Sequence, residues 1–154
     1  DFSVLPSPDH PVLCYEPMNP GETNLFGELS LQMVSVNHVV PAVGYIMKTA
    51  RHTVAFSGDT TTNDTFWPVL NSLDKLDSLI VEAAFTNNDL KLSQQAGHYC
   101  PSTLAADLTK LKHQPKVYLS HHKPGAEQKI LAESKQEITT HQVDSLHGGQ
   151  IIPL

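Results

Sequence analysis

The stretch Val54-Ala55-Phe56-Ser57-Gly58-Asp59-Thr60 is an apolar run that ends in a glycine and a carboxylate. Its first part predicts a short strand, and the glycine predicts a sharp turn that leaves Asp59 at the end of that strand. Two other runs end in a similar way, because His38 follows Val36-Asn37 and His121 follows Val117-Tyr118-Leu119-Ser120. In a parallel or mixed sheet, residues that follow strands gather at one edge. The sequence therefore predicts that His38, Asp59 and His121 converge.

The rest of the chain alternates between strand-like and helix-like segments. Residues 1–28 are rich in proline and glycine, which predicts an irregular connection with short extended pieces. Strands are predicted over residues 28–36, 44–48, 53–56, 78–85, 116–120 and 150–152, and helices over 64–73, 101–113 and 125–139. Strands that alternate with helices indicate an α/β layered sheet. Its 154 residues are the length of one domain, which we assign to residues 1–154.

Composition limits the classes of partner. The net charge is −6 and the lysines and arginines are scattered, so no nucleic-acid-binding surface is expected. No apolar stretch approaches the roughly 20 residues that span a bilayer, so no membrane segment is expected. Cys14 and Cys100 are expected to be free thiols, with a single disulfide as the alternative. The cytoplasm is the favoured compartment, and the periplasm stays open.

The residue types at the three strand ends are those that bind transition metals. Imidazole nitrogens and carboxylate oxygens are ligands for zinc, iron and manganese. Asp59 has two oxygens with which to bridge two ions, although it could instead cap the turn that follows it. His38 could likewise be structural. Of the adjacent His121 and His122, which point to opposite sides of an extended chain, His121 is chosen as the one facing the metal.

A fourth histidine and a buried glutamate complete the set of candidate residues. His98 lies just before the helix predicted to start at Pro101, and there it could bind a phosphate or protonate a leaving group. The alternative is an ordinary loop histidine. Glu82 ends the strand Leu79-Ile80-Val81 and needs a partner if it is buried. A carboxylate that orients an imidazole and raises its basicity is a natural pairing, so we expect Glu82 to hold His98.

These motifs, taken in order, resemble the metallo-β-lactamase superfamily. The segments Val36–Tyr45, Phe56–Thr60, Leu79–Phe85, Gly97–Pro101 and Ser120–Gly125 are similar in particular to class II 3′,5′-cyclic-nucleotide phosphodiesterases. The likeness extends over about residues 10–154. The superfamily signature His-x-His-x-Asp-His is absent from these residues, and the chain begins at Asp1 rather than at a methionine. We therefore expect the chain to be the C-terminal half of the fold, with the signature upstream.

The resemblance implies an αββα sandwich with two divalent metal ions at one edge of its sheets, zinc most readily and iron or manganese as alternatives. His38 would serve one metal, His121 the other, and Asp59 would bridge them. The catalytic set would be Asp59, Glu82 and His98, with His98 stabilising the phosphate or protonating the departing 3′ oxygen. The implied reaction is hydrolysis of a small cyclic nucleotide, cyclic AMP above all, to the nucleoside 5′-monophosphate. The isolated chain is expected to be inactive, and a homodimer is left open.

Two other functions compete with this one. A tRNA 3′-processing endonuclease on the same fold resembles the chain at His38, Asp59, Glu82 and His98, but it needs an RNA-docking basic surface or arm. A degenerate, non-catalytic domain that acts by binding or assembly is the second. Transfer-RNA binding tests the first alternative, and metal content tests the second.

Overall fold

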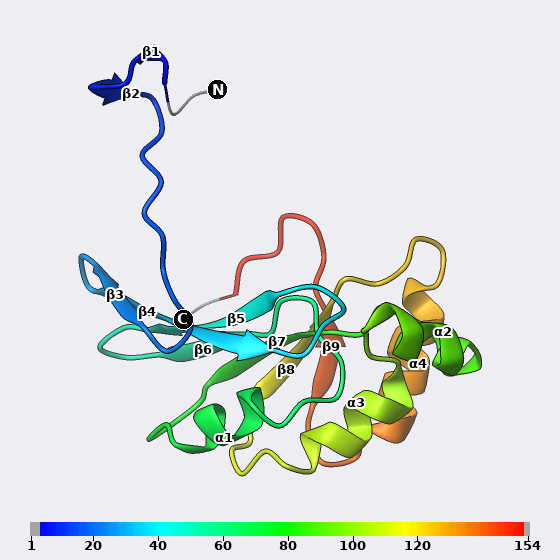
Figure 1. The fold of residues 1–154 in the computed structure, drawn as a ribbon. Coiled ribbons are helices and arrows are strands. Elements are labelled where there is room, and N and C mark those ends of the chain that lie inside the picture. The colour runs from blue at the N-terminus through cyan, green and yellow to red at the C-terminus, as the bar shows by residue number, and fades with distance from the viewer. Residues whose placement is uncertain (1–3, 153–154) are drawn as a thin grey trace.

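The computed structural model describes residues 4–152, and a seven-stranded mixed sheet forms its centre (Figure 1). The strands lie side by side in the same order as they occur in the chain. They are β3 (Thr23–Phe26), β4 (Leu29–Val36), β5 (Ala42–Lys48), β6 (Thr53–Phe56), β7 (Ser78–Glu82), β8 (Lys116–Ser120) and β9 (Val143–Ser145). Two short strands, β1 (Pro6–Ser7) and β2 (His10–Pro11), pair on an N-terminal segment that extends away from the body.

Strand direction explains why one edge of the sheet collects the candidate residues. Strands β3 to β6 pair antiparallel, and β6 to β9 pair parallel. Because β4 is two antiparallel steps from β6, the strands β4, β6, β7 and β8 all run in the same direction. Their carboxyl ends therefore lie at the same edge, as the sequence predicts.

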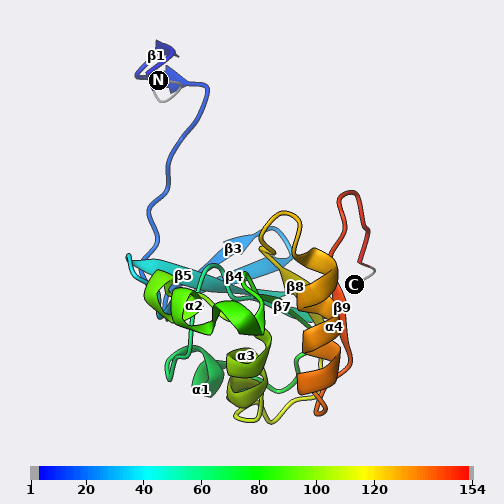
Figure 2. The ribbon, with the colours of Figure 1, turned by 90° about the vertical axis from the view of Figure 1, so that its right-hand side faces the viewer.

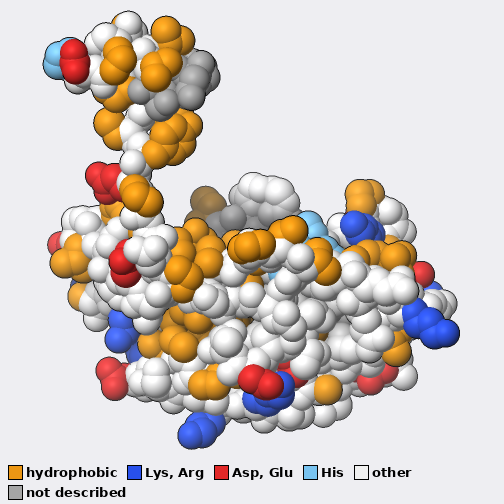
Figure 3. Space-filling view, in the orientation of Figure 1, with side chains coloured by type: hydrophobic (Ala, Val, Ile, Leu, Met, Phe, Trp, Pro, Cys, Tyr) orange, Lys and Arg blue, Asp and Glu red, His pale blue; other side chains and the backbone are white. Residues whose placement is uncertain are grey.

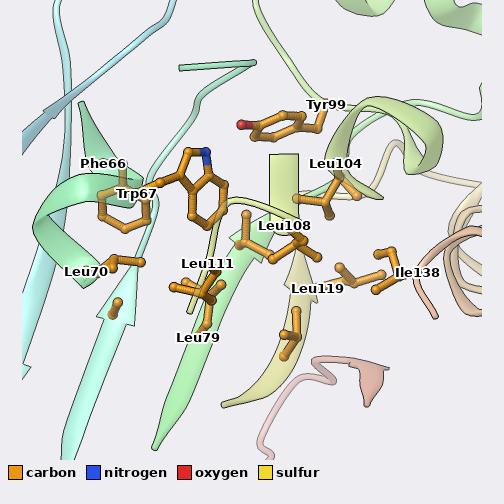
Figure 4. Close-up of a cluster of buried hydrophobic side chains, with 14 of the residues drawn as sticks. Phe66, Trp67, Leu70, Leu79, Tyr99, Leu104, Leu108, Leu111, Leu119 and Ile138 are labelled. Carbon is orange, nitrogen blue, oxygen red and sulfur yellow. The ribbon is translucent and has the colours of Figure 1, made fainter. Parts of the chain in front are cut away.

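One face of the sheet is covered by helices (Figure 2). These are α1 (Phe66–Asn71), α2 (Leu90–Ala96), α3 (Pro101–Leu108) and α4 (Glu127–Glu137), with a 3₁₀ turn over Asn87–Asp89. Apolar side chains of α1, α3 and α4 pack with alternate residues of the strands in a single core (Figure 4). Fully buried members include Phe66, Trp67, Leu79, Leu104 and Leu119. At ~2 kcal/mol for each large side chain removed from water, this core is the main source of stability.

The opposite face of β4, β5 and β6 is also apolar, but it is only partly covered. Leu31, Met33, Tyr45, Met47 and Phe56 alternate with the core residues and line a groove of about 300 Å³. Strands that are apolar on both faces are typical of sheets covered on both sides. The α/β class is confirmed, and the sheet with one helical layer corresponds to half of an αββα sandwich.

Apolar side chains also lie on the outer surface. Figure 3 shows them on the N-terminal segment and on the upper side of the body, where histidine side chains are visible among them. Cys14 is exposed and Cys100 is buried, and both are free, as predicted. Within residues 4–152, each helix is too short or too polar to cross a bilayer.

The short extended pieces predicted within residues 1–28 are found as β1, β2 and β3, of which β3 is stabilised by pairing with β4. Other predicted elements need correction. The helix predicted to reach His113 ends at Leu108, where Lys110 and Leu111 close turns. The predicted strand 150–152 is not one, and Ile151 is 89% exposed. The sheet ends instead with β9, whose Val143-Asp144-Ser145 is too short and polar to give a strand signal.

Candidate metal centre

The turn after β6 holds Asp59 at the sheet edge. Gly58 has φ +60°, and a Cβ at this position would lie 2.4 Å from the carbonyl oxygen of Val43. Only glycine accommodates both this dihedral and this approach. The Ser57 hydroxyl donates to the Gly58 carbonyl and accepts the backbone N–H of Glu82 at 3.2 Å, which ties the turn to the end of β7. The sequence Ser-Gly-Asp therefore makes the turn that the pattern predicts.

His38 lies two residues beyond β4 and is fixed through one ring nitrogen. Its Nδ1 is 2.8 Å from the Gly97 carbonyl oxygen. A carbonyl only accepts, so Nδ1 carries the proton and Nε2 keeps its lone pair. This arrangement, in which the nitrogen on the far side is held by a backbone carbonyl, is common among metal-binding histidines.

Glu82 holds His98 in the same way. The carboxylate is 1% exposed, and its Oε1 is 2.6 Å from Nδ1 of His98. It also accepts the backbone N–H groups of Thr60 at 2.8 Å and Tyr99 at 3.3 Å. The glutamate thus joins the loop after Asp59 to the segment that carries His98, and the pairing predicted from the sequence is present.

Burial favours the uncharged forms of this pair. It raises the pKa of Glu82 to about 7, although the bonds from the Thr60 and Tyr99 backbones act in the opposite direction. Burial, together with the nearby His38, lowers the pKa of His98. A neutral imidazole is the form that binds a metal ion, and it is also the form that is ready to take up a proton.

His121 has an unusual backbone conformation. Its φ is +61°, the one positive value outside glycine among the described residues. Such a conformation costs a non-glycine residue free energy and occurs preferentially at functional sites. The ring stacks on that of His98 with 5.0 Å between centroids, and its Nδ1 is 3.7 Å from Oδ1 of Asp59. His122 instead lines a separate pocket beside α4.

All five candidate residues come together at the sheet edge. Ligand atoms of His38, Asp59 and His98 lie within 4.8 Å of one another, and His121 adjoins Asp59 and His98. The sequence assigns His98 to catalysis and His121 to the metal, whereas the structure places His98 in the three-residue group. The Glu82–His98 pair does not separate the two roles, because a carboxylate orients a metal ligand as readily as a proton donor.

Some groups that shape the site have no signal in the sequence. The Gly97 carbonyl and the Thr60 N–H are backbone groups that any residue would supply. The buried carboxylate of Asp107 lies behind the site and accepts bonds from Tyr99, Trp67 and the Asn63 backbone. It lies on the buried face of its helix beside Leu104 and Leu108, where the pattern predicts only leucines.

The donor set fits a divalent metal ion. Two imidazoles with free Nε2 atoms and one carboxylate are the three protein ligands of many catalytic zinc sites, and His121 is a neighbouring fourth donor. The Nδ1 partners of His38 and His98 set ring orientation before any ion arrives.

A family model described as "Beta-lactamase superfamily domain" matches residues 2–122. The chain is similar in structure to the metallo-beta-lactamase fold protein YhfI from Bacillus subtilis, with a TM-score of 0.71, 19% identity, and coverage of 86% of this chain and 53% of that one. Human tRNase Z, short form, matches with a TM-score of 0.63 and 14% identity, over 84% of this chain and 45% of that one. Zn²⁺-bound PqqB from Methylobacterium extorquens matches with a TM-score of 0.62 and 14% identity, over 89% of this chain and 51% of that one. The chain thus spans about half the length of these structures. A comparison with curated protein sequences gives no significant match.

Proposed function

The chain belongs to the beta-lactamase superfamily, and from this membership and the site geometry we propose that it is the metal-binding C-terminal half of a 3′,5′-cyclic-nucleotide phosphodiesterase. One observation carries the proposal. His38 and His98 are each held through Nδ1, which leaves Nε2 of both rings free, and a ring nitrogen of each lies within 4.8 Å of an oxygen of the Asp59 carboxylate. Cyclic AMP is the first substrate to consider, and the product is the nucleoside 5′-monophosphate.

His38, Asp59 and His121 are the residues proposed to hold the metal, and His98 lies in one group with His38 and Asp59. A divalent ion, when bound, supplies positive charge for phosphoryl oxygens and lowers the pKa of water. Two ions with zinc as the first candidate are proposed, and iron or manganese are alternatives with the same ligands. Among the similarly folded proteins, PqqB is Zn²⁺-bound, and CmlA from Streptomyces venezuelae is a diiron β-hydroxylase.

The chain's own residues account for proton transfer and orientation. Hydrolysis adds the oxygen of water to phosphorus, breaks the bond to the 3′ oxygen and delivers a proton to that oxygen. His98 is the proposed donor, because its uncharged ring can take up the proton that the attacking water loses and pass it to the 3′ oxygen while Glu82 holds its far nitrogen. Oδ1 of Asp59 lies 3.7 Å from Nδ1 of His121, and Asp59 is more exposed than Glu82, the other carboxylate at the site.

Two variants test these roles. In protein expressed from its complete reading frame, Asp59→Ala should abolish metal binding and turnover together. His98→Ala should keep the metal and lose rate if His98 is a proton donor. If His98→Ala instead loses metal in parallel with rate, His98 is a ligand. Unchanged turnover in His98→Ala would remove it from the reaction altogether.

The tRNA-processing alternative is favoured by one observation, the structural similarity to human tRNase Z. At 14% identity this similarity shows the fold alone. The net charge of −6 and the scattered basic residues argue against RNA docking. A gel-shift assay with transfer RNA distinguishes the two enzymes. Two metal ions per chain would be inconsistent with the remaining alternative, a degenerate non-catalytic domain.

A further inference from the structure

The loop after β8 places a lysine beside the candidate metal centre with its backbone fixed on both sides. The N–H of Lys123 donates to the Ala84 carbonyl oxygen at 3.0 Å, and its own carbonyl accepts the N–H of Ala126 at 3.0 Å. Pro124 and Gly125 fill the two central positions of this turn, and Gly125 has φ +85°. Proline followed by a glycine of positive φ is the signature of a type II turn. The start of the side chain is therefore held against the end of β7.

The lysine side chain has an aromatic platform. Its ammonium nitrogen lies 5.1 Å from the centre of the Phe85 ring, and that ring lies 5.9 Å from the ring of His98. Phe85 is 7% exposed, so it is a fixed surface. A cation over an aromatic face is stabilised without being neutralised. Among the residues that the structure describes, Lys123 is in no ion pair, whereas Lys75, Lys110, Lys129 and Lys135 are.

The negative charge of the chain indicates how the Lys123 ammonium could act at the site. Asp59 is a partly exposed carboxylate at the site, and the whole chain has a net charge of −6. A phosphodiester is an anion, and approach to such a surface costs free energy unless positive charge is close by. The Phe85 ring lies next to both the Lys123 ammonium and the ring of His98, which places the ammonium beside the site.

We propose that Lys123 binds a nonbridging oxygen of the substrate phosphate, with Phe85 and the turn at Pro124-Gly125 holding the ammonium in position. The proposal rests on the proposed phosphodiesterase function and adds to it the group that recognises the anion. Lysine is suited to this task because it is a point charge that adapts to phosphates in different orientations.

The chain contains a matched control for this lysine. Lys116 lies at the opposite end of β8, and its ammonium is 5.0 Å from the ring centre of Tyr118. At ~3.3 Å per residue, the length of this strand separates it from the site by about 15 Å. Lys116→Ala therefore removes the same charge and the same kind of aromatic contact, but from the start of β8, away from the metal centre.

The test measures binding of inorganic phosphate and of cyclic AMP to the zinc-loaded protein by calorimetry, with zinc content measured for every variant. Lys123→Ala should retain its zinc and bind both anions about tenfold more weakly, the loss of one charge-assisted bond at an accessible site. Lys123→Arg should stay within about threefold of the wild type, and so should Lys116→Ala. The difference in anion affinity between the wild type and Lys123→Ala should become smaller as the salt concentration is raised, since exposed charges are screened.

Each other result overturns the proposal. If the wild type and Lys123→Ala bound inorganic phosphate and cyclic AMP with equal affinity, Lys123 would have no role in phosphate binding, but the proposed phosphodiesterase function would still stand. An equal loss in Lys116→Ala would mean that only net charge matters. Loss of zinc from Lys123→Ala would mean that the lysine supports the metal centre rather than the phosphate. If the zinc-loaded wild type bound neither anion, the proposed function would fail as well.

Discussion

Replacement of Asp107 by alanine should destabilise the protein severely, because this buried carboxylate joins four parts of the chain. It is 3% exposed. Its Oδ2 accepts the Tyr99 hydroxyl at 2.6 Å, and Trp67 Nε1 and the Asn63 N–H each at 3.1 Å. Its Oδ1 lies 2.9 Å from the Lys110 ammonium.

The expected loss follows from the groups left without a partner. Each buried donor that loses its acceptor costs about 1 to 3 kcal/mol, and the Tyr99, Trp67 and Asn63 donors are all buried. Penetration of water and relief of the buried negative charge offset part of this sum. Three such donors sum to about 3 to 9 kcal/mol before these offsets, so we expect a net loss of about 3 to 5 kcal/mol. In a chain of this length that corresponds to a fall in Tm of about 6 to 20 °C.

Urea unfolding followed by fluorescence is a direct assay, since Trp67 is the single tryptophan and bonds to Asp107. Asp64→Ala is the matched control, because Asp64 pairs with the same Lys110 but its side chain is 91% exposed. It should cost less than about 1 kcal/mol. A loss below about 1 kcal/mol in Asp107→Ala would refute the reasoning, as would equal losses in the two variants.

Three further predictions concern the turn, the pH dependence and the metal. Gly58→Ala should cost at least about 1 kcal/mol in urea unfolding and weaken zinc binding, because the added Cβ meets the Val43 carbonyl at 2.4 Å and displaces Asp59; unchanged zinc affinity would contradict this. The hydrogen bond from the Thr53 N–H lowers the pKa of the Asp77 carboxyl below its ordinary value of 3.8. The contribution of this carboxylate to folding stability is therefore present above the ordinary pKa and is lost as the pH falls through the pKa of the folded state. Asp77→Ala should therefore be less stable by about 1 kcal/mol at about pH 7, with a smaller difference in acid; a difference independent of pH would contradict this. Zinc at about 100 times its Kd should stabilise the wild type by ~2.7 kcal/mol, seen as a rise in Tm that a chelator reverses; an equal rise in Asp59→Ala would place the ion elsewhere.

The convergence of the site could be predicted because it depends on strand direction. Alternation along β4, the apolar runs of β7 and β8 and the glycine before Asp59 each identify a strand and its end. Once the strands are known, the edge follows. Elements stabilised mainly by their neighbours escaped prediction. The strand β9 has one apolar residue in the core and depends on pairing with β8.

Roles within the site were harder to predict than its location. The sequence pairs Glu82 with His98 correctly, but it gives no means of knowing that His98 would lie in one group with His38 and Asp59. That arrangement depends on the Gly97 carbonyl, which fixes His38 from the same loop that carries His98. Lys123 lies in the Ser120–Gly125 segment that carries the resemblance, but the sequence assigns it no role, and only the approach of its side chain to Phe85 marks it.

Phosphorus NMR of cyclic AMP, incubated with zinc-loaded protein from the complete reading frame, tests the central claim most directly. We predict that the cyclic phosphodiester resonance is replaced by that of adenosine 5′-monophosphate, and that Asp59→Ala leaves the cyclic resonance unchanged. A zinc-loaded wild-type protein that leaves cyclic AMP intact, or that releases the 3′-monophosphate, would contradict the proposed function.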